Sequence, residues 1–248
     1  MKLRTIQRRL TGFGLVCAFG ASAFAGNFAN ITIDGSTADW AGIAPAYTDE
    51  DGVNNPGGVD YQNVFLANDA SYLYIRILLK QPADPISAGN TYIWLDNDNN
   101  STTGFHPFGN PNFGSSVMII GDQAYQEAGG GFNEGTLSAS VAYGASSIPG
   151  TDFEFRIALN TVGVSGAYTG VSLLDSATLG VQLASETGTG DSLPAWVNYG
   201  ALSYTIAPQP VPEPSTLAMA GLGLLFFARR FFVRTNHRVT INQQPMAI

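Results

Sequence analysis

The chain has 248 residues, of which 12% are charged and 29 are glycine, a composition that suits a loop-rich β domain better than a helical one. All 19 acidic residues lie between Asp34 and Glu213, and only three basic residues lie among them, which leaves this segment with a net charge of −16. Such an acidic segment repels phosphate groups, so nucleic acid is excluded as a partner.

The first 25 residues have the three regions of a secretory signal peptide. Four basic residues lie within the first nine positions, residues 11–20 are apolar or small, and Ala23 and Ala25 give the small-x-small pattern that a signal peptidase requires. The apolar run is too short to span the ~30 Å core of a bilayer. We therefore predict a signal peptide at residues 1–25 with cleavage after Ala25. Because the single Cys17 lies within it, the exported domain has neither a disulfide nor a thiolate metal site.

Residues 26–206 are predicted to form one acidic, all-β domain, an antiparallel β-sandwich or jelly roll. Short segments of alternating apolar residues are separated by glycine-rich breaks, and helical periodicity is almost absent. Within 72–79 the residues Leu73, Ile75, Ile77 and Leu79 share one face. A short turn of helix is expected at 159–163. The predicted strands are residues 30–34, 64–67, 72–79, 92–95, 116–120, 137–143, 153–159, 177–184 and 196–206.

An oxygen-rich segment follows directly after the predicted strand 92–95. Asp96, Asp98 and Asn100 occupy alternate positions, so their side chains are able to converge on one hard cation, and calcium prefers oxygen ligands. The segment is not an EF-hand, because Ser101 and Pro107 stand where that motif has glycine and a bidentate glutamate. The alternative is a hairpin in which these side chains cap their own backbone. We predict a calcium site here, with the capped hairpin as the open alternative.

Two aromatic residues of one strand are the candidate ligand-binding residues. Trp94 and Tyr92 share a strand face, opposite Ile93 and Leu95, and an exposed indole is a flat surface on which a sugar ring stacks. Trp40 is instead the candidate for a buried core residue. The aromatic-rich segment 105–113 is expected to form either a rim of the binding site or a packed lid.

The residue types of the domain do not favour catalysis. Residues 190–193 spell the short Gly-Asp-Ser-Leu motif of lipases and esterases, but no histidine base follows within the domain. Asp96 and Asp98 are too close in sequence to flank a glycosidic bond convincingly. We therefore predict a non-catalytic protein, and a carboxylate-based glycoside hydrolase remains as an alternative.

The C-terminal segment combines a proline-rich linker, an apolar run and a basic cluster. Residues 207–216 alternate proline with other residues, which favours a stiff, extended linker. The apolar run then extends to Val233, and snorkelling arginines make residues 217–233 long enough for a transmembrane helix. Residues 234–248 form a basic and polar tail. The arginines would stay in the cytoplasm, so the acidic domain would lie outside.

This C-terminal order of residues resembles the PEP-CTERM sorting signal. The resemblance covers residues 211–230 and rests on Pro212, Glu213 and Pro214, a glycine-containing apolar segment, and the basic pair Arg229 and Arg230. It implies a Gram-negative bacterium with an exopolysaccharide or biofilm system and processing by an exosortase-type membrane protease. The protein would cross the inner membrane, be held there by its C-terminal helix, and then reach the cell surface or extracellular matrix. The chain continues to Ile248, whereas this family usually ends soon after the basic cluster.

The domain itself resembles family 9-like carbohydrate-binding modules. The resemblance rests on Asp34-Gly35 with Asp39-Trp40, on Asn68-Asp69, and on the segments 72–75, 94–99 and 154–159. It implies a β-sandwich with structural calcium and aromatic residues that hold sugars. The leading hypothesis is a non-catalytic module that binds extracellular polysaccharide and has a calcium-stabilised loop. A purely structural protein of the extracellular matrix or biofilm is the first alternative.

Overall fold

The computed structural model describes residues 26–49, 55, 57–87, 90–129, 131–132, 141–165, 168–174, 176–186, 188, 190–194 and 201–210. The predicted signal peptide, the residues Pro212 to Pro214, the apolar segment 217–233 and the tail lie outside the described residues. The chain divides after Ala207 into two units, and the first of them holds the β domain. In the described ranges, no helix is long and apolar enough to cross a membrane.

The first sheet has five strands in the order β1-β2-β3-β8-β7, and all of its pairs are antiparallel. The predicted strands 64–67 and 72–79 form a hairpin, because β2 and β3 pair from Asn68↔Leu73 onwards. At its turn the Asp69 carboxylate accepts hydrogen bonds from the backbone N–H groups of Ser71 and Tyr72. The strands are β1 (Tyr47–Thr48), β2 (Tyr61–Asn68), β3 (Tyr72–Ala83), β7 (Ala142–Ala145) and β8 (Gly150–Ala158).

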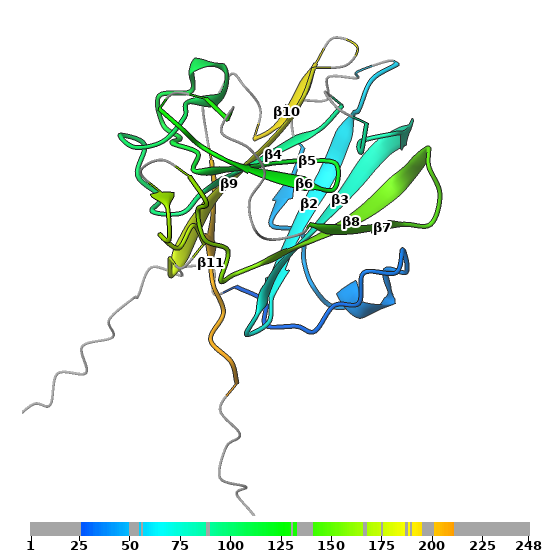
Figure 1. Cartoon of the computed structure of the whole chain (residues 1–248). Coiled ribbons are helices and arrows are strands. Elements are labelled where there is room, and N and C mark those ends of the chain that lie inside the picture. The colour runs from blue at the N-terminus through cyan, green and yellow to red at the C-terminus, as the bar shows by residue number, and fades with distance from the viewer. Residues whose placement is uncertain are drawn as a thin grey trace, which may run out of the picture. The chain divides into compact units, whose positions relative to one another are not determined.

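The second sheet has the order β10-β9-β4-β5-β6, and β11 also pairs with β9. The strand β4 lies between β9 and β5 and is antiparallel to both. Figure 1 shows this sheet facing the first one, with β4 and β5 across from β2 and β3. The strands are β4 (Tyr92–Asp96), β5 (Val117–Ile120), β6 (Gln123–Gln126), β9 (Thr178–Ser185), β10 (Asp191–Leu193) and β11 (Leu202–Thr205).

The main hydrophobic core fills the space between the two sheets. Alternate residues of β3, from Leu73 to Leu79, face Ile93 and Leu95 of β4 there, and all of them are buried. On the opposite face of β3, the guanidinium of Arg76 lies 4.7 Å from the centre of the Phe65 ring. The predicted all-β antiparallel sandwich is thus confirmed. The alternation of residues in β3 also predicted correctly which of its side chains share the face that packs in the core.

The outer face of the first sheet is covered by the N-terminal segment 26–43, the blue trace beside that sheet in Figure 1. A short 3-10 helix, η1 (Ala38–Trp40), ends in Trp40, which is 2% exposed. The Trp40 indole N–H donates a hydrogen bond of 2.6 Å to Glu154 Oε1, and the Gly35 N–H donates one of 3.1 Å to Oε2. The prediction that Trp40 is buried is confirmed.

Several predicted elements differ from the structure. The predicted strand 30–34 does not form; the segment pairs earlier, at Phe28, where it bridges Asn68. No helix forms at 159–163, because the backbones of Val162 and Gly163 instead make bridges to residues 172 and 169. The strands β1, β6 and β10 were not predicted, since they are short and carry little apolar periodicity. Residues 137–140 and 196–200 of two predicted strands lie outside the described part of the chain.

Candidate functional site

An aromatic pocket lies on the outer face of the second sheet. Tyr92 and Trp94 project from β4 away from the main core, as the alternation predicted, and pack in a separate cluster. Their rings are stacked, with centroids 5.2 Å apart and an interplanar angle of 12°. The pocket has a volume of about 460 Å³, and its lining includes Tyr92, Trp94, Phe105, Phe108, Phe132 and Glu186.

The segment 105–113 forms one wall of the pocket and is fastened to the sheet. The backbones of Phe105 and Ser115 exchange two hydrogen bonds of 2.8 and 2.7 Å. The Asn110 amide donates to Gln182 of β9 at 3.3 Å, and Phe113 is fully buried. His106 Nδ1 lies 2.8 Å from the Phe113 carbonyl oxygen and donates to it. Both expectations for this segment therefore hold in part, because Phe113 is packed while Phe105 and Phe108 line the pocket.

Phe108 is the most exposed aromatic side chain of the pocket, at 44%. It lies in the 3-10 turn η2 (Pro107–Gly109) and has a φ of +52°, a backbone conformation that is strained for a residue with a side chain. Its ring meets the Trp94 indole edge-on, with centroids 5.3 Å apart. Strained residues are concentrated at functional sites, so this turn is a second indication that the pocket is functional.

Trp94 is not the exposed platform that the sequence suggested. It is 3% exposed, because Tyr92 covers one face of the indole and Phe108 meets its edge. Its indole N–H is buried and has no hydrogen-bond partner among the described residues. A buried donor without a partner costs about 1–3 kcal/mol. The indole N–H of Trp94 therefore differs from that of Trp40, which donates to Glu154.

Glu186 is the charged residue of the pocket lining. It follows the last residue of β9, is exposed, and accepts a long hydrogen bond of 3.4 Å from the Tyr92 hydroxyl. Burial and the neighbouring Glu186 carboxylate together raise the pKa of Tyr92. Sequence analysis missed Glu186 and Phe132, because only the pairing of β9 with β4 and the packing of residue 132 bring them to the aromatic pair.

The loop after β4 has the capped-hairpin geometry that the sequence offered as the alternative. Each of the three predicted cation ligands accepts a hydrogen bond from a backbone N–H two residues later: Asp98 to Asp96 at 3.2 Å, Asn100 to Asp98 at 3.1 Å, and Thr102 to Asn100 at 3.0 Å. The Thr103 hydroxyl also lies 2.9 Å from Asp98 Oδ2. The loop is therefore shaped by its own backbone contacts, whether or not it binds a cation.

The same loop brings the carboxylates of Asp96 and Asp98 together, and this pair of oxygen ligands is the feature of the loop that suits calcium. Burial, followed by the hydrogen bond and the charge of Asp98, raises the pKa of Asp96 to about 6. An oxygen atom that accepts one hydrogen bond still has a free lone pair for a metal. In the part of the chain that the structure describes, no group of three His, Cys, Asp or Glu side chains is arranged for a metal. A cation at this loop would therefore need Asn100 and main-chain oxygens beside the two aspartates.

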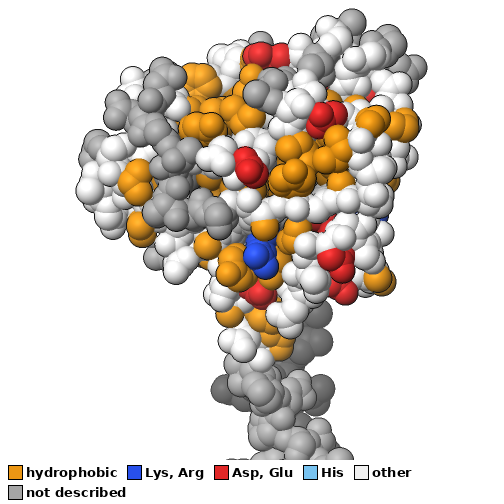
Figure 2. Space-filling view, turned by 45° about the vertical axis from the view of Figure 1, so that its right-hand side comes forward, with side chains coloured by type: hydrophobic (Ala, Val, Ile, Leu, Met, Phe, Trp, Pro, Cys, Tyr) orange, Lys and Arg blue, Asp and Glu red, His pale blue; other side chains and the backbone are white. Residues whose placement is uncertain are grey.

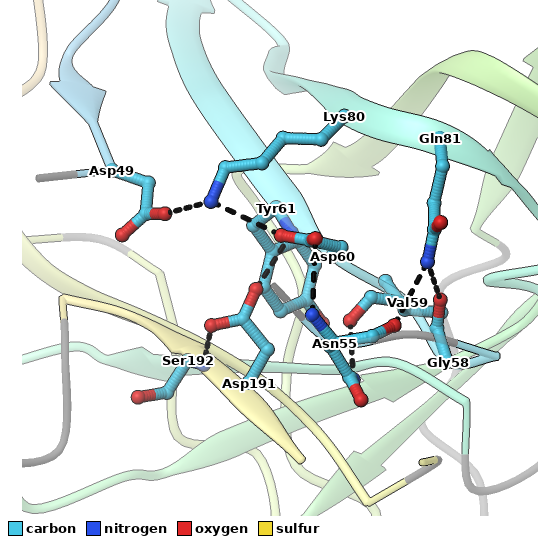
Figure 3. Close-up of polar contacts among 10 residues, drawn as sticks. All are labelled: Asp49, Asn55, Gly58, Val59, Asp60, Tyr61, Lys80, Gln81, Asp191 and Ser192. Carbon is cyan, nitrogen blue, oxygen red and sulfur yellow. Dashed lines mark hydrogen bonds and ion pairs between the residues drawn. The ribbon is translucent and has the colours of Figure 1, made fainter. Parts of the chain in front are cut away.

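A polar cluster elsewhere in the domain joins the two sheets (Figure 3). Lys80 of β3 forms ion pairs with Asp49 at 2.5 Å and with the buried Asp60 at 3.1 Å. The Asp191 carboxylate of β10 accepts a hydrogen bond of 2.6 Å from the backbone N–H of Tyr61 in β2. Ser192, the serine of the Gly-Asp-Ser-Leu motif, is buried within β10. This position suits a structural link between the sheets and does not suit a nucleophile.

Comparison with known proteins supports the sorting signal. A family model, described as the PEP-CTERM protein-sorting motif, matches residues 210–234, which confirms the resemblance at residues 211–230. No curated protein matches the chain. The motif indicates export and membrane-associated sorting in a Gram-negative bacterium.

Two solved structures of a family 9 carbohydrate-binding module from Caldicellulosiruptor kristjanssonii are similar to the chain. The complex with glucose is 12% identical, with a TM-score of 0.40 over 76% of this chain and 98% of that chain. The complex with cellotriose is 12% identical, with a TM-score of 0.39 over 77% of this chain and 95% of that chain. Both belong to the family that the domain's sequence resembles. The sugars are ligands of those modules, and any ligand of this chain has to be argued from its own residues.

Proposed function

We propose that the chain is an exported, non-catalytic module that binds polysaccharide in the aromatic pocket of the second sheet. The observation that carries this proposal is the pocket itself. Its volume of about 460 Å³ lies in the range of ligand sites, which are mostly apolar with a few polar groups. Tyr92 and Phe108 offer apolar ring surface to the C–H face of a sugar, and the Glu186 carboxylate at the pocket offers an acceptor to a sugar hydroxyl.

The distribution of carboxylates favours binding over hydrolysis. A glycoside hydrolase places two carboxylates about 5–10 Å apart on either side of the scissile bond. Three cavities are formed by described residues. The one beside Ser71 and Asn160 has no carboxylate in its lining, the one beside Gln81 has Asp84 alone, and the aromatic pocket has Glu186 alone. The hydrolase alternative therefore has no supporting pair in these cavities.

Calcium at the loop 96–104 is part of the proposal. Asp96 and Asp98 would supply carboxylate oxygens and Asn100 an amide oxygen, a donor set that calcium prefers. A bound cation would stabilise the ionised form of Asp96, which burial and then the neighbouring Asp98 disfavour. Because Asp96 ends β4, a stable loop would also hold the strand that carries Tyr92 and Trp94.

The sorting motif supports a location outside the cytoplasm. We infer that an exosortase-type membrane protease processes the chain near Pro212-Glu213-Pro214. Residues 217–233 would hold the chain in the membrane until then. The domain would afterwards reside at the cell surface or in the extracellular matrix, where polysaccharide is abundant.

Binding is tested with the full chain in a non-ionic polyoxyethylene detergent, which carries neither sugar nor charge. The ligands are cello-, chito-, xylo- and manno-oligosaccharides, titrated calorimetrically. The Phe108→Ala variant should bind about tenfold more weakly, as expected for an aromatic contact residue. Tyr143 of β7 is 40% exposed on the other sheet, so Tyr143→Ala is the matched control and should bind normally.

Melting followed by circular dichroism shows whether each variant is folded. If no oligosaccharide binds to the folded wild type, the polysaccharide proposal is wrong, and the purely structural matrix role becomes the better hypothesis. If Tyr143→Ala weakens binding as much as Phe108→Ala, sugars bind elsewhere on the domain.

A further inference from the structure

The charged groups around the aromatic pocket restrict which polysaccharide it takes, provided that the proposed function holds. The pocket lining contains the Glu186 carboxylate and no basic side chain. Glu186 lies beside stacked and edge-to-face rings, with the Tyr92 hydroxyl 3.4 Å from its Oε2. Aromatic faces carry partial negative charge, so the pocket is negative in both its apolar and its polar parts.

No lysine or arginine of the domain is placed to offset this charge, and its one histidine, His106, is held by the carbonyl oxygens of Asn110 and Phe113 and does not line the pocket. Residues 26–207 contain three lysine and arginine side chains, Arg76, Lys80 and Arg156, and all three lie in β3 and β8 of the other sheet. Arg76 forms a two-contact ion pair with Asp152 at 2.8 and 2.6 Å. Lys80 is held in the cluster of Figure 3, and the Arg156 guanidinium lies 4.4 Å from the centre of the Tyr72 ring. On the face drawn in Figure 2, acidic side chains likewise outnumber basic ones.

We propose that the pocket selects an amine-bearing polysaccharide, namely a partly N-deacetylated hexosamine polymer, over neutral glycans and against acidic ones. A protonated amine gains from two neighbours here, the aromatic faces through cation–π attraction and the Glu186 carboxylate through a charge-assisted hydrogen bond. A uronate or sulfate group would meet the same carboxylate with no cation nearby, so it is repelled. The sugar rings themselves still stack on the aromatic side chains.

The test compares ligands that differ only in their amino group. Glucosamine oligomers and N-acetylglucosamine oligomers of equal length are titrated into the full chain in the same detergent. A pH of about 6 keeps glutamate ionised and an amine protonated. The glucosamine oligomers should bind about three- to tenfold more tightly, the range expected for one exposed ion pair combined with a cation–π contact. Galacturonate oligomers should bind more weakly than either.

Two charge-removing variants separate the pocket from the general acidity of the domain. Glu186→Gln keeps the shape of the side chain and should remove most of the preference for glucosamine, leaving only the part that comes from the aromatic faces. Asp122→Asn removes an equal charge from the exposed turn between β5 and β6, and should leave the preference intact. A higher salt concentration should reduce the preference of the wild type for glucosamine over N-acetylglucosamine oligomers. The ratio of the two affinities in Glu186→Gln should change little.

Each outcome supports or overturns the inference. Equal binding of the two oligomers, or equal effects of the two variants, overturns amine selection, while the proposed function stands because neutral sugars still bind. Failure of every oligomer to bind overturns both. A preference that Glu186→Gln reduces and Asp122→Asn leaves intact supports the inference.

Discussion

The two outer faces of the sandwich each bury one tryptophan, and they do so in different ways. Trp40 is sealed under the N-terminal segment, and its indole N–H donates to Glu154. Trp94 is buried to nearly the same extent, at 3% against 2%, yet its N–H has no partner among the described residues and it lines an open pocket. The two tryptophans therefore differ in the hydrogen bonding of their N–H groups and hardly in burial. A closed core normally satisfies its donors, and the surroundings of Trp40 do so.

The largest expected effect is a loss of stability caused by a substitution on the outer face that contains Trp40. Trp40→Ala should lower the free energy of unfolding by about 3–5 kcal/mol, because it leaves a cavity under the N-terminal segment. It also removes the indole partner of the buried Glu154. Urea denaturation measures the loss. Oligosaccharide affinity of the molecules that remain folded should be unchanged, and a loss of affinity would show that the two faces are coupled.

Calcium should stabilise the folded domain by binding to the loop that follows β4, the strand that carries Tyr92 and Trp94. At a calcium concentration about a hundredfold above its dissociation constant, the free energy of unfolding should rise by about 2.7 kcal/mol. Thermal melting with calcium and then with EDTA measures the rise, and Asp98→Asn should reduce it. Asp122→Asn, a surface carboxylate away from the loop, is the control. A wild type that melts identically in calcium and in EDTA would leave the loop as a capped hairpin.

Matched Trp→Phe substitutions sharpen the comparison of the two indoles. Both remove similar volume, but Trp40→Phe leaves Glu154 without its 2.6 Å donor, whereas Trp94→Phe removes a donor that has no partner. Trp40→Phe should therefore be the more destabilising by about 2 kcal/mol. The comparison uses chemical denaturation without ligand. Equal losses would mean that the Trp94 N–H is satisfied in solution.

The smallest effect concerns the dependence of stability on pH. Burial raises the pKa of Glu154 above its usual value of 4.5, more than the hydrogen bonds from Trp40 and Gly35 lower it. A folded-state pKa above the unfolded one gives stability that is complete below pH 4.5 and is lost as the pH rises through the folded pKa. The slope from this group is at most about 1.4 kcal/mol per pH unit.

Glu154→Gln tests this sign, because it removes the titrating group and keeps its shape. Unfolding free energies measured from pH 4.5 upward should fall less steeply in the variant than in the wild type. If the variant has the same slope as the wild type, another titrating group of the domain causes the loss of stability with rising pH.

Local sequence patterns determined the strands that have a strong alternation and the faces of their side chains. The period of two placed Leu73 and Ile77 in the core and Tyr92 and Trp94 on the opposite face, because successive side chains of any strand point to opposite sides. The sorting motif was equally local, since it is read from contiguous residues. Short strands such as β6 and β10 escaped prediction, because their few residues have no apolar pattern and form only by pairing with a neighbour.

The character of each outer face was decided by the tertiary structure alone. The sequence predicted burial for Trp40 and exposure for Trp94, whereas both are buried, and what differs is whether an acceptor from a distant strand reaches the indole N–H. Glu154 reaches Trp40 from 114 positions away, and Glu186 reaches Tyr92 from 94 positions away. Contacts at that separation depend on the pairing of whole strands and leave no local pattern. The sequence by itself thus determined the sandwich and the acidity of the domain, and packing decided which aromatic cluster was closed and which lines a pocket.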